Sequence, residues 1–182
     1  MALDCLTAGN NIPTEINVII EVPAHSEPIK YEMGIDATTL VVSHFLTTSM
    51  HYPCDYGYMP RALTMASKPL EVLVITPSPV NRGCVVRCRP LGVLVMNEGK
   101  RHDHKILALP CPELTNKYDH VDSIEDLPDL LVQKIAHFFT HYRDLEAVAA
   151  VSCEGWLNID AAKKEIMASI ARYEDQHIKS CA

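Results

Sequence analysis

The sequence predicts a single α+β domain in which a closed β-barrel carries two flanking helices. Many short runs rich in β-branched residues, separated by closely spaced turn signals, fill the chain up to Pro112, a pattern typical of a small barrel. A helical stripe of apolar residues begins at Leu127, and a second one follows Asn158. The 182 residues, 48% of them hydrophobic, suffice for one core, so we expect one domain over residues 1–182.

The strands are expected in the first two thirds of the chain, divided by glycine, proline and polar residues. Lys30 and Glu32 alternate on one face of their strand. The predicted strands are 16–22, 29–33, 39–45, 70–76, 84–96 and 105–109. Turns are expected at 24–28, 34–38 and 82–83, a rigid Tyr-Pro loop at 50–60, and a polar hairpin loop at 97–104.

A change in the spacing of the apolar residues, from strand-like to helical, predicts the two helices. Asp126 is the expected cap of the first helix, with Pro128 in its first turn. Asn158 is the expected cap of the last helix, whose tail from Gln176 should fray. A strand and turn are expected between the two helices, at 148–156.

Composition excludes several classes of protein. A net charge of −7 with a pI of about 5.7 argues against a general nucleic-acid binder. A membrane partner is not expected, because no apolar run reaches the roughly 18 residues that a spanning helix needs. The N-terminus has no signal-peptide pattern, and the seven cysteines include no C-x-x-C pair. These features favour reduced thiols and a cytoplasmic location.

Several charged and imidazole side chains are candidates for chemistry, each with a structural alternative. Glu21, Lys30 and Glu32 face either a polar cavity or solvent. Asp103 and Lys105 either share a cavity or belong to a solvated hairpin. His44 and His51 fit packed or surface histidines, and Arg143 satisfies a helix dipole. His137 and His141, one helical turn apart, could bind a metal, but a subunit interface is favoured.

Seven stretches together resemble the soluble family I inorganic pyrophosphatases, bacterial members most closely. These stretches are 19–24, 28–32, 52–58, 86–90, 117–120, 135–139 and 154–156. The resemblance spans about Pro13 to Ile170 and implies a five-stranded OB-like barrel. It also implies Mg²⁺-dependent hydrolysis of diphosphate, in which carboxylates gather the cations and a metal-bound water attacks.

The resemblance assigns roles to residues at matching positions. Substrate-binding candidates are Lys30, Tyr52, Tyr56, Lys105, Tyr142 and Arg143, the last standing where the family uses Lys. Metal-ligand candidates are Glu21, Glu32, Glu71, Glu98 and Asp103. Candidate catalytic residues in the altered centre are Lys68, Glu71, Asp103, His44 and His51.

The centre departs from the family pattern. The Asp-x-Asp-Pro-x-Asp run of the family reads Ala66-Ser67-Lys68-Pro69-Leu70-Glu71 here, which replaces three negative charges by a net charge of zero. At three further positions this chain also differs from the family. Glu98 stands where the family has an Asp, His44 where it has a phosphate-binding Arg, and His51 where it has an aromatic residue. Lys68 repels Mg²⁺, and the longer Glu71 shifts its carboxylate by roughly 1 Å. We therefore expect diphosphate hydrolysis to be lost or strongly reduced.

Three functions remain open at this point. The chain is a residual or altered hydrolase, a repurposed enzyme using His44, His51 and Lys68, or a non-catalytic protein that binds a phosphorylated or other anionic ligand or a protein partner. The resemblance also implies a homo-oligomer, and specifically a hexamer with His137 and His141 at the contact.

Overall fold

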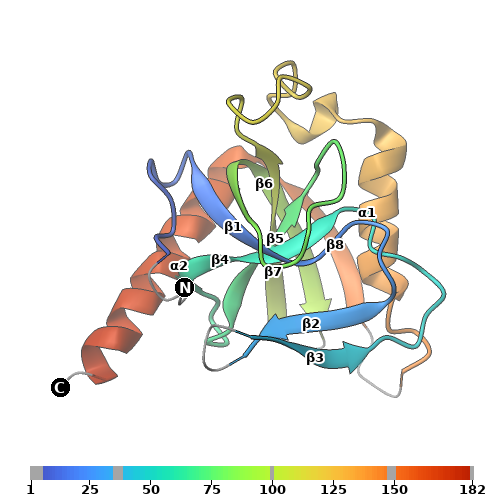
Figure 1. Ribbon diagram of the computed structural model, residues 1–182, viewed down its shortest axis with the longest axis horizontal. Coiled ribbons are helices and arrows are strands. Elements are labelled where there is room, and N and C mark those ends of the chain that lie inside the picture. The colour runs from blue at the N-terminus through green and yellow to red at the C-terminus, as the bar shows by residue number, and fades with distance from the viewer. Residues whose placement is uncertain (1–5, 35–38, 99–100, 147–150, 181–182) are drawn as a thin grey trace.

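The computed structural model describes residues 6–34, 39–98, 101–146 and 151–180. Its centre is a closed five-stranded barrel (Figure 1). The strands pair in the order β1 (Ile16–Val22), β4 (Asp55–Leu63), β5 (Pro69–Val74), β7 (Arg101–Pro110) and β6 (Val85–Glu98), and β6 pairs back with β1. The β5–β7 pair is parallel and the other pairs are antiparallel. This mixed, OB-like barrel confirms the predicted class.

Three further strands of the described chain lie outside the closed barrel. The long strand β6 pairs with β1 through its first half, and with β8 (Val151–Leu157) through its second half. Strands β2 (Ile29–Met33) and β3 (Leu40–Phe45) form a separate antiparallel pair, seen in front of the lower end of the barrel in Figure 1. This pair carries Lys30, which contributes to the site described below.

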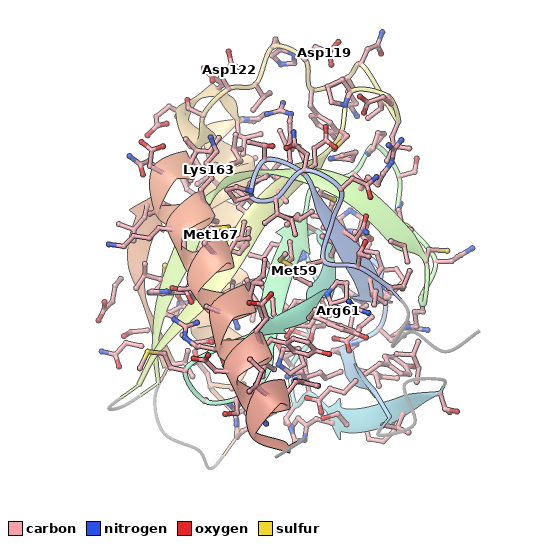
Figure 2. The ribbon with its side chains drawn as sticks, turned by 90° about the vertical axis from the view of Figure 1, so that its left-hand side faces the viewer. Met59, Arg61, Asp119, Asp122, Lys163 and Met167 are labelled. Carbon is pink, nitrogen blue, oxygen red and sulfur yellow. The ribbon has the colours of Figure 1, made fainter. Side chains whose placement is uncertain are left out.

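Alternating side chains of the barrel divide the core into two clusters. Leu73 packs in the cluster that includes Phe138 of helix α1 (Asp129–His141). Val72 and Val74, its neighbours on β5, pack in the cluster that includes Ile166 of helix α2 (Ile159–Ser180). Figure 2 shows α2 lying across the barrel strands. The helices therefore cover different parts of the barrel, each through its apolar stripe.

Gly57 sets the close approach of β1 and β4. A Cβ atom at this position would lie 1.9 Å from the carbonyl oxygen of Ile19. Only glycine therefore permits the observed pairing, in which Gly57 lies opposite Ile20. The pairing fixes the neighbouring Tyr56, which is buried.

The start of the first helix corrects one prediction. Asp126 does not cap α1 but ends a short 3-10 helix, η2 (Ile124–Asp126), where its carboxylate accepts a hydrogen bond from the Ser123 backbone. Pro128 occupies the cap position and α1 begins at Asp129. The cap of α2 is confirmed, because Asn158 Oδ1 accepts a 3.1 Å hydrogen bond from the Ala161 backbone nitrogen.

Three predicted irregular segments were wrong in part. Cross-strand pairing extends β6 to Glu98 and β7 from Arg101, so most of the expected loop at 97–104 is strand. Residues 55–60 of the expected Tyr-Pro loop belong to β4 for the same reason. The expected fraying from Gln176 is absent from the described chain, since α2 continues to Ser180. The predicted turn at 34–38 lies mostly outside the described residues, as do residues 148–150 of the predicted strand.

Neither described helix combines the length and the apolar character that crossing a bilayer requires.

Candidate functional site

A cavity of about 500 Å³ opens where β4, β5 and β7 meet the end of α1 and the middle of α2. Strands β4 and β5 contribute Tyr56 and Glu71, and β7 contributes Asp103, His104 and Lys105. The remaining lining residues are Lys30, Tyr52, Thr64, Met65, Ala66, Lys68, Pro69, Phe139, Tyr142, Arg143, Glu165 and Arg172.

Lys105 is the centre of the ion pairs in this cavity. Its ammonium group bonds Glu71 and lies 2.6 Å from Asp103 Oδ2, while 5% of the residue is exposed. Burial alone would lower the pKa of Lys105, but the carboxylates of Glu71 and Asp103 outweigh it and raise the pKa. Lys105 is therefore a fixed positive charge at neutral pH.

Glu71 is paired on both carboxylate oxygens. Oε2 bonds Lys105, and Oε1 lies 3.6 Å from Lys30 Nζ. Burial would raise the pKa of Glu71, but these two ammonium groups outweigh it and lower the pKa to about 2. Lys30 also lies 3.1 Å from Glu32. The prediction that Lys30 and Glu32 share a strand face is thereby confirmed.

Aromatic side chains form the wall behind these charges. The Tyr52 ring lies 4.7 Å from that of Phe138 and 5.5 Å from that of Tyr56. Burial, followed by nearby groups that include Tyr142 and Glu71, raises the pKa of Tyr52. Burial and the Glu71 carboxylate raise the pKa of Tyr56. Both phenols stay protonated at neutral pH and can donate hydrogen bonds.

Lys68 lies on the turn that joins β4 to β5. The Thr64 backbone nitrogen donates to the Lys68 carbonyl oxygen at 2.7 Å, and Thr64 Oγ1 accepts from the Lys68 nitrogen at 3.3 Å. Ser67 has a φ of +56°, a left-handed conformation that is unusual for a residue other than glycine. The Lys68 side chain forms no ion pair with the residues that the structure describes. The turn therefore contributes to the cavity lining a lysine that has no acidic partner among the described residues.

A polar network on α2 contacts the end of β4, just before this turn. Arg172 Nη1 donates to the Leu63 carbonyl oxygen at 3.0 Å and to Glu165 Oε1 at 2.9 Å. Glu165 Oε2 lies 3.1 Å from His104 Nδ1. The hydrogen bond to Glu165 raises the pKa of His104, although burial opposes it. Burial would raise the pKa of Glu165, but His104 and Arg172 lower it to about 2.

The structure brings together most of the predicted site residues. Lys30, Tyr52, Tyr56, Lys68, Glu71, Asp103, Lys105, Tyr142 and Arg143 all line the one cavity. Glu21 is buried, and its charge contributes to the raised pKa values of Tyr52 and Tyr56. Glu32 does not line the cavity but forms an ion pair with Lys30, which does. The Glu98 side chain lies outside the described residues.

Two predicted residues lie elsewhere. His44, on β3, is exposed and its Nε2 lies 2.9 Å from Glu146 Oε1. His51 Nδ1 lies 2.8 Å from the Ser26 carbonyl oxygen, and the residue lines a different cavity. Neither lines the cavity that contains Lys68.

Sequence reasoning missed His104, Glu165 and Arg172. Glu165 and Arg172 are two turns apart on one helix, so their spacing places both on one face, but nothing local marks that face as part of a site. His104 stands between two predicted site residues on a strand, where alternation assigns it to the other face. Its nearness to the cavity follows from the packing of α2 against β7.

In the described ranges 6–34, 39–98, 101–146 and 151–180, no group of three or more His, Cys, Asp and Glu residues is placed to hold a metal ion. The carboxylates of Glu71 and Asp103 are instead bonded to ammonium groups.

Fold and site together define a barrel protein with a lysine-rich, carboxylate-bearing cavity. A family model described as inorganic pyrophosphatase matches residues 18–174. The inorganic pyrophosphatase of Escherichia coli K12 is 46% identical over 176 residues, which cover 97% of this chain and 100% of that protein. That of Agrobacterium fabrum is also 46% identical, over 97% of this chain and 99% of the relative.

A solved inorganic pyrophosphatase structure from Coxiella burnetii superposes with a TM-score of 0.88 at 42% identity. The match covers 92% of this chain and 99% of that one. The chain belongs to the inorganic pyrophosphatase family.

Proposed function

We propose that this member of the inorganic pyrophosphatase family binds diphosphate or a related phosphorylated anion without a divalent metal, and that its Mg²⁺-dependent hydrolysis of diphosphate is lost or strongly reduced. The observation that carries the proposal is Lys68. Lys68 lines the cavity without an acidic partner among the described residues, at the position where the family resemblance places an Asp. Ala66, two residues earlier, cannot ligate a cation.

The charges of the cavity support an anionic ligand. Five of the lining residues are Lys or Arg and three are Asp or Glu, which leaves an excess of two positive charges. Each of the three lining carboxylates already has a Lys or Arg partner. An entering phosphate group would therefore meet cations, and no unpaired carboxylate of the lining would repel it.

The replacement of Asp by Lys also conserves local charge. One Mg²⁺ ion together with one carboxylate has a net charge of +1, as does a single ammonium group. Lys68 can thus supply attraction for a phosphate oxygen without a metal. It cannot lower the pKa of a bound water as a metal does, so binding survives the substitution while hydrolysis does not.

The donor set fits a cluster of Mg²⁺ ions poorly. Both oxygens of Glu71 are engaged by Lys105 and Lys30, and Asp103 shares Lys105. Mg²⁺ favours near-octahedral oxygen coordination through one or two carboxylates plus substrate. An ion placed here would have to displace an ammonium group and would then lie near Lys68.

Two measurements test the proposal together. Calorimetry with diphosphate in EDTA should show binding that Lys68→Ala weakens about tenfold, the loss of one charge-assisted hydrogen bond. Lys164→Ala, an exposed lysine of α2 outside the cavity, is the control. Phosphate release from diphosphate with Mg²⁺ or Mn²⁺ should not exceed the blank. Absence of binding heat, or turnover well above the blank, would refute the proposal.

The repurposed enzyme that uses His44, His51 and Lys68 has less support. The two histidines lie outside the cavity that Lys68 lines, and each already contacts another group. A second intact pyrophosphatase gene, together with biosynthetic genes beside this one, would favour this alternative.

We also propose that the chain forms a homo-oligomer, a hexamer on the family resemblance, through His137 and His141. Both histidines are exposed, and their rings lie 4.6 Å apart on α1. Exposed neighbouring imidazoles on a helix suit a contact between copies. Light scattering at micromolar concentration should give a multiple of 20.3 kDa, and a monomer mass would overturn this expectation.

We place this function in the cytoplasm, where thiols remain reduced. Cys54, Cys84, Cys88, Cys111 and Cys153 are free cysteines in the structure. Recovery of the chain from an extracellular fraction of intact cells would contradict this location.

A further inference from the structure

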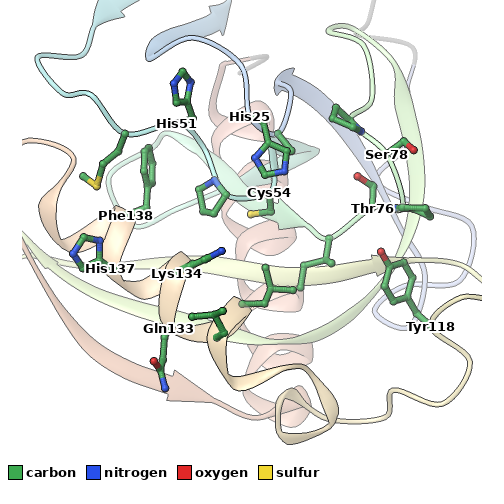
Figure 3. A pocket seen from close by; sticks show the side chains of 18 of the residues that line it. His25, His51, Cys54, Thr76, Ser78, Tyr118, Gln133, Lys134, His137 and Phe138 are labelled. Carbon is green, nitrogen blue, oxygen red and sulfur yellow. The ribbon is translucent and has the colours of Figure 1, made fainter.

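A second cavity, of about 790 Å³, lies between α1 and four other chain segments and is separate from the site above (Figure 3). Its lining comes from residues 24–25, 49–51, 53–54, 75–79, 117–118, 130–131, 133–134 and 137–138. It shares no lining residue with the first cavity. Its volume lies within the range of pockets that hold small organic ligands.

The charge of this cavity contrasts with that of the chain. The protein has a net charge of −7, yet no Asp or Glu is among the described residues that line the cavity. Lys117 and Lys134 line it instead, together with His25, His51 and His137. Neither lysine forms an ion pair within the described residues. The cavity is therefore a cationic region on an acidic protein.

The walls between these cations are apolar. Met50, Ile75, Leu131 and Phe138 contribute hydrocarbon and aromatic surface. Figure 3 shows the Lys134 side chain extending from α1 into the cavity, between His137 and Cys54. A ligand could thus place a flat or aliphatic body on the apolar wall and direct an anionic group to Lys134.

A buried carboxylate holds the loops around the cavity in place. Asp55 has no exposed surface, and its Oδ1 accepts from the Ala24 nitrogen at 2.7 Å and from the Val80 nitrogen at 3.2 Å. Its Oδ2 accepts from Thr76 Oγ1 at 2.5 Å. One side chain thereby fixes two of the loops that form the cavity wall, so the wall is formed before a ligand binds.

Hydrogen bonds hold the backbone of His25 and the imidazole of His51, two residues of the cavity lining. His25 has a φ of +60°, a strained conformation for a residue other than glycine. Its backbone nitrogen donates to the Tyr52 carbonyl oxygen at 2.8 Å. His51 Nδ1 must carry a proton, because its neighbour at 2.8 Å is the Ser26 carbonyl oxygen, which can only accept. Rigid polar groups around an apolar wall are typical of a ligand site.

We propose that this second cavity binds a small organic anion, a carboxylate, sulfonate or phosphate group attached to an apolar body about the size of one or two rings. Charge complementarity with Lys117 and Lys134 selects the anion, and the apolar wall selects the body. The proposal is independent of the function of the first cavity. The other conceivable occupant is a second copy of the chain, because His137 also belongs to the proposed contact between copies.

Fluorescence titration with 1-anilinonaphthalene-8-sulfonate tests the proposal on the full chain. The sulfonate should bind at one site per chain and at least about tenfold more tightly than the same ring system without the sulfonate. Lys134→Met, which keeps the length and apolar stem, should weaken binding about fivefold or more, and so should Lys117→Met. Lys164→Met, on an exposed part of α2, is the matched control and should leave binding unchanged.

Two further measurements distinguish this cavity from the first one and a small ligand from a second copy of the chain. An excess of diphosphate and the Lys68→Ala variant should both leave the fluorescence unchanged, since they act on the first cavity. Light scattering with and without the sulfonate should give the same mass. The proposal would be overturned if the neutral ring bound equally well, if Lys134→Met had no effect, or if diphosphate displaced the sulfonate. Dissociation of an oligomer by the sulfonate would also overturn it, because the cavity would then belong to a contact with a second copy.

Discussion

Arg172 Nη1 lies 3.0 Å from the carbonyl oxygen of Leu63, a residue 109 positions earlier in the chain. The bond joins α2 to the last residue of β4, immediately before the turn that carries Lys68. Glu165 and Ser169 hold the same guanidinium nitrogen at 2.9 Å and 3.0 Å. The C-terminal helix therefore helps to position the cation on which the proposed ligand binding depends.

Replacing Arg172 tests this connection. Arg172→Ala should weaken the metal-independent binding of diphosphate about five- to tenfold, because the turn loses its support and the cavity loses one cation. The free energy of unfolding should fall by about 1–3 kcal/mol, since Glu165 and the Leu63 carbonyl each lose a charged donor. Calorimetry and urea unfolding measure the two effects. Arg87→Ala, an exposed arginine on β6, is the control, and unchanged binding in Arg172→Ala would contradict the role.

The stability of the fold should depend on pH through Glu165. Its pKa in the folded protein is about 2, below the ordinary value of 4.5, since His104 and Arg172 outweigh the effect of burial. A lowered folded-state pKa gives a stabilisation that is complete above the unfolded pKa and is lost as the pH falls from 4.5 towards 2. His104 stays protonated throughout this range, because its own pKa is raised from 6.5.

Glu165→Gln should therefore reduce the acid sensitivity of folding. The change in unfolding free energy between neutral pH and about pH 3 should become smaller by on the order of 1–2 kcal/mol. Urea unfolding across this range measures it. Glu174→Gln on the exposed side of α2 should not alter the slope, and a Glu165→Gln slope equal to that of the wild type would count against the ion pair.

Gly57→Ala should destabilise the barrel severely. The added methyl group would lie 1.9 Å from the Ile19 carbonyl oxygen, which belongs to the β1–β4 ladder and cannot move without breaking it. The expected loss exceeds about 3 kcal/mol. Gly83→Ala is the matched control, because a Cβ there meets no atom within 4 Å and costs only the strain of its φ of +80°. Similar melting temperatures for the two variants would disprove this account.

The barrel and both helices could be predicted from the sequence because the spacing of apolar residues within a short stretch distinguishes strands from helices. Runs of β-branched and other apolar residues marked β1 and β5, and the stripe from Leu127 marked α1. The boundaries were predicted less well where pairing decides them. Residues 97–104 are polar enough to suggest a loop, yet Glu98 lies opposite Arg101 because the neighbouring strands continue their ladder. Such pairing depends on contacts that no local window contains.

The residues of the candidate site also fall into those that could be predicted from the sequence and those that could not. Lys30, Glu71 and Lys105 could be grouped only through the resemblance to a family, since they come from three different strands. Arg172 was missed because, in the sequence, an arginine on an amphipathic helix is an ordinary surface residue. Its role depends on how α2 crosses the barrel next to Leu63, which is a property of packing rather than of pattern.

The strongest test of the proposed loss of hydrolysis installs the three aspartates that the family resemblance places at positions 66, 68 and 71. The triple variant Ala66→Asp, Lys68→Asp and Glu71→Asp changes the formal charge of the three positions from zero to −3 and removes the ammonium group from the turn. It should gain Mg²⁺-dependent release of phosphate from diphosphate by at least about a hundredfold over the wild type, because metal-activated water can lower the barrier by several kcal/mol. It should also lose the binding of diphosphate in EDTA, since the carboxylates then repel the ligand. Ala66→Asp alone is the control and should gain little, because Lys68 would neutralise the new carboxylate. A triple variant that folds, as judged by its melting curve, but releases no phosphate would show that residues outside this run also prevent hydrolysis.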